Sequence, residues 1–494
     1  MNTFLNEMKD TYNVGLTENG AIKRVTTKSA VLDMFALCGA YRNRSDEDCI
    51  LAFKNAFEEN RDLAMKCLFY LRDVRGGQGE RRFFRVCFTW LANNYPDVAR
   101  KNLNNVSEYG RWDDLIYTTI QTKIETDALT IVKHQLALDV DCKTPSLLAK
   151  WIPSENASNH VTKATANVIR QYLGMTHKEY RKMLSVLRAR INVLERLMSS
   201  NQWDKIEFDK IPSKAGLIYK NAFARRDIIA KKYESFIKSE NTKVNADVLN
   251  PVEIAHRAFN MGRYNIDATE RIALNKYWSC LKDYYNGRQE NGLCVCDVSG
   301  SMQVQPMEAA VSMSAYIAER GHGPFANHFI TFSSHPSLVK FEGLDIVDKF
   351  NRCRRADWGM NTDIEAVFNM LLNTAKSKHV KPEDMPTRLY IFSDMEFDEG
   401  LSDWHSRNSM NERKVNTLLE SIAKQWAREG YELPQLIFWN LDARNQNIPA
   451  INGGRFAYVS GFSMSMIESI LSGKDGYDLM LEKLLSERYQ AVTA

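Results

Sequence analysis

The sequence of 494 residues lacks several features that mark specialised classes of protein. It contains nine cysteines, and none of them forms a CxxC pair, which argues against a disulfide framework or a zinc knuckle. No run of about 18 apolar residues occurs, so no transmembrane helix is expected. The first residues lack the basic start and the apolar stretch of a secretion signal. These absences predict a reduced, cytoplasmic protein that has no membrane partner.

Signatures of common enzymes are also missing. None of the nine histidines belongs to an HExxH pattern, and no GxSxG or GKS/GKT segment marks a serine nucleophile or a P-loop. A haloacid-type phosphatase needs a second aspartate two residues after its nucleophile, and Ser299 stands in that place after Asp297. We therefore expect a protein that is not an enzyme, with a metal-dependent hydrolase as the weakest alternative.

Charge is nearly balanced over the whole chain but not along it. The net charge is +4, yet residues 1–290 carry 45 basic and 35 acidic side chains, whereas residues 291–494 carry 20 and 26. Within the first part, residues 151–250 alone carry 18 basic and 10 acidic side chains. This asymmetry indicates two parts with different partners, the basic part being suited to a polyanion. A solvated helical surface is the alternative explanation of the same excess.

The first 290 residues show the periodicity of amphipathic helices. Hydrophobic residues make up 44% of the sequence, as in globular proteins, and here they recur at spacings of three and four. The predicted helices are Ala30–Leu37, Cys49–Glu58, Leu63–Leu71, Arg81–Asn93, Ala128–Leu138, His177–Met198 and Ala222–Ile237. Stacked helices of this length predict an α-solenoid over residues 1–290, with an irregular helical bundle as the alternative.

The periodicity changes at residue 291. Short apolar segments then alternate with helical ones, which indicates a parallel sheet covered on both faces. The predicted strands are 292–297, His328–Ser333, Arg388–Ser393, Gln435–Leu441 and Phe456–Ser460. The predicted helices are Met307–Arg320, Asp363–Thr374, Asn411–Arg428, Ile467–Leu471 and Leu479–Glu487. Residues 291–494 are therefore expected to form a doubly wound α/β domain, in which ligands bind at the carboxyl ends of the strands.

Oxygen-bearing side chains gather where such ligands bind. Asp297, Ser299 and Ser301 alternate at the end of the first strand, Thr362 precedes a helix, and Asp394 follows a later strand. Two carboxylates and three hydroxyls, completed by water, are hard oxygen ligands for a six-coordinate Mg²⁺ or Mn²⁺. The alternative is a strand-end turn in which Asp297 caps the next helix and the serines satisfy backbone amides.

The pattern Asp297-x-Ser299-x-Ser301, with Thr362 and Asp394 downstream, resembles the metal-ion-dependent adhesion site of von Willebrand factor A domains. All five positions of that pattern are present in the expected order. The resemblance implies a von Willebrand A-type domain over residues 291–494 that binds one Mg²⁺ or Mn²⁺. It also implies an open coordination position, which would accept an Asp or Glu side chain from a partner protein.

Three segments of the helical part, Arg72–Arg81, Tyr109–Leu115 and Ser146–Pro153, are similar to a family that pairs a helical module with a C-terminal von Willebrand A domain. The layout of that family resembles the Ro autoantigen (TROVE) proteins. In those proteins a ring of HEAT-like helical repeats is closed by a von Willebrand A domain and binds small structured RNAs. The resemblance implies a TROVE-like helical domain in an RNA-binding ribonucleoprotein, and no RNA-contact residue is carried over by position.

Candidate phosphate contacts come from basic side chains in or near the predicted helices. They are Arg72, Arg75, Arg81, Arg82, Arg181, Lys182, Arg188, Arg225, Arg226, Lys231 and Lys232. Arg75 begins the glycine-rich turn at residues 75–79, and Arg72, Arg81 and Arg82 flank it. Backbone amides and guanidinium groups of such a turn are suited to a phosphate. The alternatives are a helix end followed by a new helix start for this turn, and a solvated helix face for the other residues.

The sequence as a whole predicts a non-enzymatic, metal-dependent binding scaffold. The first hypothesis for its ligand is structured or single-stranded RNA, bound by the helical part. The second hypothesis is a protein-interaction adaptor that uses its bound metal to hold a carboxylate of a partner. Salt-dependent retention of RNA distinguishes the first from the second.

Overall fold

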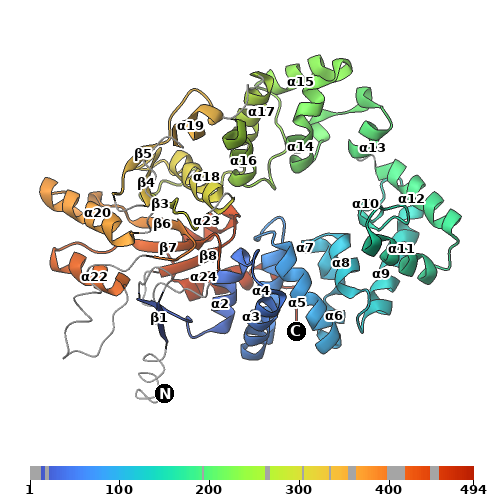
Figure 1. Ribbon diagram of the computed structural model, residues 1–494, viewed down its shortest axis with the longest axis horizontal. Helices are drawn as coiled ribbons and strands as arrows, with labels where there is room; N and C mark the ends of the chain where they lie inside the picture. Colours follow the sequence, from blue (N-terminus) through green and yellow to red (C-terminus); the bar gives the residue numbers. More distant parts are fainter. Residues whose placement is uncertain are drawn as a thin grey trace.

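A computed structural model describes residues 13–16, 22–191, 194–261, 268–302, 305–332, 335–353, 363–397, 418–444 and 456–494. In it a long series of helices is followed by a sheet domain (Figure 1). The series is curved, so that both its first and its last helices contact the sheet domain. Within the described residues, no helix has the length and apolar character needed to cross a membrane.

Helices make up most of the first part, and capping side chains explain where several of them begin. Ser29, Ser45 and Asn60 each accept a backbone amide from the first turn of the following helix, which satisfies donors that the helix leaves unpaired. The helices of this part are α2 (Ala30–Leu37), α3 (Asp46–Glu59), α4 (Arg61–Arg72), α5 (Arg81–Asn94), α6 (Pro96–Lys101), α7 (Leu103–Tyr109), α8 (Trp112–Thr119), α9 (Glu125–Asp141), α10 (Leu148–Trp151), α11 (His160–Tyr172), α12 (His177–Ile191), α13 (Leu194–Ser199), α14 (Ser213–Arg225), α15 (Asp227–Lys238), α16 (Pro251–Met261) and α17 (Ala268–Ser279). Short 3-10 helices are η1 (Cys38–Ala40), η2 (Trp203–Lys205) and η3 (Phe208–Lys210).

Two features of the first part differ from the predicted helices. Strands β1 (Val14–Leu16) and β2 (Ile22–Arg24) form an antiparallel pair ahead of α2, where no strand was predicted. The predicted helix Ala222–Ile237 is wrong as a single element, because the extended backbone of Arg226 separates α14 from α15. The apolar spacing continues across this break, and a periodicity argument therefore misses it.

The second part is built on one six-stranded sheet with the order β5-β4-β3-β6-β7-β8. Its strands are β3 (Gly292–Asp297), β4 (His328–Phe332), β5 (Leu338–Lys340), β6 (Arg388–Ser393), β7 (Gln435–Asn440) and β8 (Phe456–Ser460). The accompanying helices are α18 (Gln305–Arg320), α19 (Ile346–Cys353), α20 (Ile364–Lys378), α22 (Leu418–Arg428), α23 (Ile467–Ile470) and α24 (Gly476–Leu484), with the 3-10 helices η4 (Pro382–Asp384), η5 (Met464–Met466) and η6 (Glu487–Tyr489). Neighbouring strands are parallel except β4 and β5, so the sheet is mixed and not purely parallel as expected.

The chain changes direction across the sheet between β3 and β6. From β3 it passes through α18 to β4 on one side, and from β6 it passes through α22 to β7 on the other side. Right-handed crossovers in opposite directions place the two helices on opposite faces of the sheet. The carboxyl ends of β3 and β6 therefore lie at a switch point, which is the usual ligand position in a doubly wound sheet.

The first helices close against the sheet domain along a first seam. The amide of Gly39 donates to Ser460 Oγ (3.0 Å). A Cβ atom on residue 39 would lie 2.5 Å from Ser460 Oγ and 2.8 Å from the Ser460 carbonyl oxygen, so this close approach requires glycine. Further along the seam, Arg488 Nη2 donates to the buried Asp73 (2.6 Å), and Tyr489 donates to the same carboxylate (2.9 Å). The beginning and the end of the described chain are thereby held together.

The last helices of the series meet the sheet domain along a second seam. Arg271 of α17 donates two hydrogen bonds to Asp345, at 2.7 and 2.8 Å. Nδ1 of His256, on α16, lies 2.6 Å from Glu308 Oε2, on α18. One hydrophobic core runs through the helical part and the sheet domain. With both seams packed, the two parts form a single closed loop (Figure 1).

Candidate functional site

The strand-end cluster consists of Asp297, Ser299, Ser301 and Asp394, which the order of the strands brings to one edge of the sheet. The fully buried Asp297 accepts the amide of Ser299 at 2.9 Å, and Ser299 Oγ lies 2.9 Å from Ser301 Oγ. Across from β3, Ser393 Oγ of β6 donates to Asp297 Oδ2 at 2.5 Å. The carboxylate and hydroxyl groups of this turn therefore lie within hydrogen-bonding distance of one another.

Asp394 brings a second buried carboxylate to the cluster. Its Oδ2 accepts a hydrogen bond from Arg444 Nη2 at 2.7 Å, and its Oδ1 accepts the amide of Glu396 at 3.2 Å. Burial, together with the negative charge of Asp394, raises the pKa of Asp297. Within the described part of the chain, one of the two carboxylates faces a guanidinium and the other faces only hydroxyl and amide donors. The pair is therefore short of positive charge.

A divalent cation fits this donor set. Carboxylate and hydroxyl oxygens suit Mg²⁺ or Mn²⁺, and a cation would offset the repulsion that raises the pKa of Asp297. Thr362, the fifth predicted ligand, lies outside the described residues. Among the residues that are described, no group of three or more His, Cys, Asp or Glu side chains is arranged to hold a metal. A metal here would therefore depend on serine hydroxyls and water. The alternative role for Asp297 as a helix cap does not apply, because α18 begins only at Gln305.

A central cavity of about 830 Å³ lies within the closed loop. Its lining comes from the turn between α4 and α5 with the adjoining helix ends, from Arg111 just before α8, from α10, α13 and α14, and from segments before α16 and after η1, α17 and β8. Eight of the lining side chains are basic, namely Arg42, Arg72, Arg75, Arg81, Arg82, Arg111, Lys150 and Lys214. Three are acidic, namely Glu80, Glu195 and Asp247. The lining side chains therefore carry a net positive charge, which is suited to an anionic ligand. Carboxylates outside the lining pair with Arg72, Arg75, Arg82 and Lys214.

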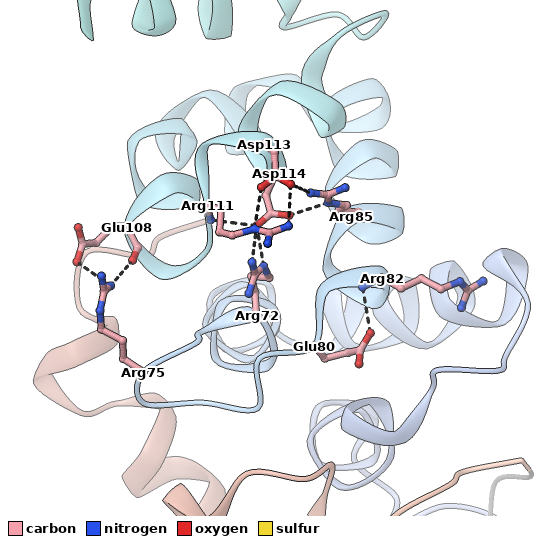
Figure 2. A network of polar contacts seen from close by, with 9 residues as sticks. All are labelled: Arg72, Arg75, Glu80, Arg82, Arg85, Glu108, Arg111, Asp113 and Asp114. Carbon is pink, nitrogen blue, oxygen red and sulfur yellow. Dashed lines mark hydrogen bonds and ion pairs between the residues drawn. The ribbon is translucent and has the colours of Figure 1, made fainter. Parts of the chain in front are cut away.

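A network of three arginines and two aspartates supports the basic side of this cavity (Figure 2). Arg72 Nη2 contacts Asp114 at 2.6 Å, and Arg85 Nε reaches the same carboxylate at 2.6 Å. Arg85 and Arg111 both contact Asp113, at 2.8 and 2.7 Å. The side chains of Arg72 and Asp114 are 2% and 0% exposed, so this pair is the buried centre of the network. The network fixes Arg111 at the cavity and leaves one positive charge uncompensated.

The glycine-rich turn joins the end of α4 to the start of α5. This was the structural alternative for the turn in the sequence analysis. Gly79 has a φ of +68°, a left-handed conformation that favours glycine. Glu80 then caps α5 by accepting the amide of Arg82 at 3.0 Å. The same turn lines the central cavity. The structural role of the turn and a role in binding are therefore compatible.

The four arginines near this turn differ in whether their guanidinium groups are free to bind a phosphate. The prediction that Arg72 contacts a phosphate is corrected, because its guanidinium is buried and already bound to an aspartate. Arg75 and Arg82 each form an ion pair at the surface. Arg81 is exposed and forms no hydrogen bond or ion pair with any described residue. Partial burial and neighbouring arginines lower the pKa of Arg81, which reflects the crowding of positive charge here.

The predicted contacts on α12 lie outside the central cavity. Arg181 and Arg188 line a second hollow together with Arg196. Lys182 lines a different hollow, whose other side chains include Met183 and Val186. Neighbouring basic residues of one helix therefore face different surroundings.

The predicted contacts on α14 and α15 are exposed and line none of these hollows. The guanidinium of Arg226 lies 4.8 Å from the ring centre of Trp203. Lys232 Nζ donates to the carbonyl of Ile206 at 2.8 Å. Arg225 and Lys231 have no partner among the described residues. A solvated helix face accounts for these positions.

Four basic residues of the cavity were not predicted, namely Arg42, Arg111, Lys150 and Lys214. Arg111 and Lys150 lie within two of the segments that carry the family resemblance, so a signal for both was present in the sequence. Both also stand near one ring, because the Arg111 guanidinium lies 3.9 Å and Lys150 Nζ 5.5 Å from the ring centre of Trp151. Arg42 and Lys214 carry no such signal.

Comparison with known families divides the chain at the change from helices to strands. Residues 17–135 and 123–284 match the model of a family described as Domain of unknown function (DUF2828), which covers more than half of the chain. The chain belongs to the DUF2828 family. Residues 291–490 match a second model, Domain of unknown function (DUF7788), so the von Willebrand A assignment of this region stays a prediction.

Relatives of this DUF2828 chain extend over nearly its whole length. It is 31% identical over 508 residues to "Uncharacterized protein L728" of Acanthamoeba polyphaga mimivirus, covering 94% of this chain and 85% of that protein. A solved structure that is similar to it is that of the Deinococcus radiodurans RO (RSR) protein, with a TM-score of 0.49 and 13% identity. That comparison covers 93% of this chain and 99% of the other.

Proposed function

We propose that this DUF2828 protein is a non-enzymatic scaffold that binds RNA in its central cavity. The observation that supports the proposal most directly is the excess of eight basic over three acidic side chains in the cavity lining. Phosphate groups are the anions that clustered guanidinium groups bind with the best geometry. The excess of 45 basic over 35 acidic side chains in residues 1–290 would attract the same ligand from a distance.

The two sides of the cavity differ in a way that favours a single strand. Most of the basic side chains come from the α4–α5 turn and its adjoining helix ends, from the residue before α8 and from α10. The segments α14 and 247–250 contribute the side chains of Ile218, Tyr219, Val248 and Leu249, together with the charged Lys214 and Asp247. A single strand carries phosphates along one side and bases that can stack on the other, whereas a duplex presents phosphates all round. The cavity therefore matches single-stranded RNA better than a duplex.

The substitution Arg81→Glu tests the proposal, because Arg81 has no partner among the described residues whose loss would disturb the fold. We expect binding of single-stranded RNA to weaken by about tenfold or more, since a contact to phosphate is replaced by repulsion. The slope of log affinity against log salt should flatten by about 0.7 for the phosphate contact that is lost. Fluorescence anisotropy with labelled RNA between about 50 and 200 mM salt measures both quantities.

Lys163→Glu on α11 is the matched control for this test. Lys163 is exposed and does not line the cavity, so its reversal changes the net charge equally at a distant place. We expect its effect on affinity to stay within about twofold, because exposed charges beyond about 10 Å are largely screened. Equal losses in the two variants would contradict the proposal, and so would the absence of RNA binding by the unsubstituted protein at low salt.

We also propose that the strand-end cluster binds one Mg²⁺ or Mn²⁺ and, through it, a carboxylate of a protein partner. The buried carboxylates of Asp297 and Asp394 and the hydroxyls of Ser299 and Ser301 support this proposal, and Thr362 stays a predicted fifth ligand. When bound, the ion would supply the positive charge that attracts an Asp or Glu side chain of the partner. Asp297 and Asp394 would hold it at the switch point of the sheet.

A further inference from the structure

A second hollow of about 400 Å³ lies beside the central cavity, between α12, α13 and the segment that follows α10. We call it the arginine hollow, because three of its lining side chains are Arg181, Arg188 and Arg196. Hydroxyl groups of Ser154 and Ser185 also line it. Guanidinium and hydroxyl groups are donors, so the chemistry of this lining suits an anion that accepts several hydrogen bonds.

Arg188 forms the fixed part of the arginine hollow. Its Nε donates to the carbonyl of Ala149 (2.7 Å), its Nη2 to the carbonyl of Ile152 (2.9 Å) and its Nη1 to Ser154 Oγ (2.7 Å). Burial lowers the pKa of Arg188, and none of these three acceptors is a carboxylate. The positive charge of Arg188 is therefore held in place without being neutralised.

Arg181 and Arg196 leave most of their donors open. Arg181 is exposed and uses Nε for the carbonyl of His177 at 3.1 Å. Arg196 is half-buried and uses Nη1 for the carbonyl of Ala189 at 3.3 Å. Neither forms an ion pair with a carboxylate of the described residues. Each guanidinium has five N–H donors, so both can still bind a ligand.

The one acidic residue in the lining does not neutralise the arginine hollow. Glu155 forms an ion pair with Arg170 at 3.0 Å and lies 2.7 Å from Nδ1 of His177. Neither of these partners lines the hollow. Residues outside the hollow therefore pair with the charge of Glu155, and the three arginines of the lining can bind an anion.

The arginine hollow lies close to the central cavity, because Arg188 of the hollow donates to the carbonyls of Ala149 and Ile152, which flank the cavity-lining Lys150 and Trp151. Lys150 of α10 and Glu195 of α13 line the cavity, and they contact each other at 3.5 Å. Ser154 and Arg196, which follow them closely along the chain, line the hollow. A strand that leaves the cavity past Lys150 and Trp151 would meet the arginine hollow next.

We infer that the arginine hollow binds a backbone phosphate of an RNA strand whose neighbouring nucleotides occupy the central cavity. The inference rests on the proposed function and extends the RNA site from the cavity onto α12. Three guanidinium groups around one hollow suit a phosphate group. The position of the hollow beside the cavity favours RNA over a phosphorylated protein as the source of that phosphate.

Two neighbouring charge reversals on α12 test this inference in the full-length protein. Arg181→Glu changes the arginine hollow, and Lys182→Glu makes a similar change at the next residue, which lines a different hollow. Each variant is titrated with labelled single-stranded RNAs of about 4 to about 16 nucleotides, the range of known single-strand site sizes. We expect Arg181→Glu to weaken binding of the longest RNAs by about tenfold, with a salt slope flatter by about 0.7, and to leave the shortest unaffected. Lys182→Glu should change each affinity by about twofold or less.

A second variant keeps the test informative if Arg181→Glu disturbs the fold. Arg196→Gln removes one charge and keeps a polar side chain of similar shape, and it should cause the same length-dependent loss. Thermal unfolding shows whether each variant is folded.

Three outcomes would overturn the inference. The first is equal affinity of Arg181→Glu and the unsubstituted protein at every RNA length, and the second is equal loss in Arg181→Glu and Lys182→Glu. Both leave the proposed function intact as long as Arg81→Glu weakens all RNAs. The third is binding of a phosphoserine peptide that requires Arg181 while RNA affinity does not depend on length, which would assign the hollow to a protein ligand.

Discussion

The basic side of the central cavity and the strand-end cluster both bury charged side chains, but with opposite balance. In the cavity network three arginines meet two aspartates (Figure 2). In the strand-end cluster two aspartates meet one arginine, Arg444. A buried charge is tolerated where it is paired, and an unpaired excess stabilises a ligand of the opposite sign. One closed loop therefore carries an excess of positive charge in one place and an excess of negative charge in another.

The largest expected effect comes from breaking the paired centre of the cavity network. Asp114→Ala removes the carboxylate that Arg72 and Arg85 share, and it leaves the buried Arg72 without a partner. Loss of one partner of a buried ion pair costs about 3–5 kcal/mol, so the free energy of unfolding should fall by that amount. Chemical denaturation, followed by circular dichroism, measures the change.

Asp113→Ala is the control for this prediction. Asp113 contacts Arg85 and Arg111, whose side chains are each 26% exposed, so water can replace the lost carboxylate. We expect a loss of about 1 kcal/mol. A loss as large as that of Asp114→Ala would contradict the conclusion that burial of Arg72 sets the strength of the network.

A smaller effect is expected at the first seam, and it should depend on pH. Burial opposes the charged form of Asp73, but hydrogen bonds from Arg488 outweigh it and hold the pKa of Asp73 below its ordinary value. Such a group adds stability above its unfolded pKa of about 3.9, and that stability is lost as the pH falls through the lower folded pKa. Asp73→Asn should therefore cost about 2 kcal/mol at neutral pH and progressively less in acid. Denaturation curves at several pH values test this, and a difference from the unsubstituted protein that is independent of pH would contradict it.

Much of the sheet could be predicted from the sequence, because a buried parallel strand is a short apolar run and can be recognised without knowing which strands it pairs with. The bounds of β3, β6 and β8 are as predicted. The edge strand β5 (Leu338–Lys340) was missed, because it exists through its pairing with β4 and its side chains are not buried. The break at Arg226 was missed because apolar residues on its two sides keep helical spacing.

The pairing of charges could not be predicted from the sequence. Arg72 resembles the other arginines of its segment until the fold places Asp114, 42 residues away, against it. The glycine-rich turn nevertheless pointed to the cavity, because a turn between helices exposes both its amides and its flanking side chains. The separation of Arg181 from Lys182 likewise depends on which hollow each side chain lines, and this follows only from the packing of α12.

The two proposed ligands should respond to different substitutions. Asp297→Asn removes one carboxylate charge from the strand-end cluster but keeps the shape of the side chain. We expect it to abolish binding of one Mn²⁺, measured by isothermal titration calorimetry, because hard cations depend on carboxylate ligands. RNA affinity should change by about twofold or less, because Asp297 does not line the cavity and Debye screening weakens distant charges. Arg81→Glu should show the reverse pattern, and a shared loss in either variant would contradict two separate sites.

The smallest effect is expected on the exposed face of α14 and α15. The double substitution Arg225→Glu and Lys231→Glu reverses two solvated charges outside the cavity. RNA affinity should fall by about threefold or less at 150 mM salt, because screening leaves only a weak long-range attraction. Anisotropy titrations alongside Arg81→Glu rank the two surfaces, and an equal or larger loss in the double variant would move the RNA site to this outer face.

The first seam also has a consequence for the synthesis of the protein. Asp73 is 415 positions from Arg488, and Gly39 is 421 positions from Ser460. At about 5–20 residues per second, a ribosome takes roughly 20–80 s to make the chain between these partners. During this time the apolar surface that α2 later buries against β8 faces water, and nascent chains in that state are prone to aggregate. The emerging helices must therefore stay soluble by themselves or with a chaperone until translation delivers the residues that complete them.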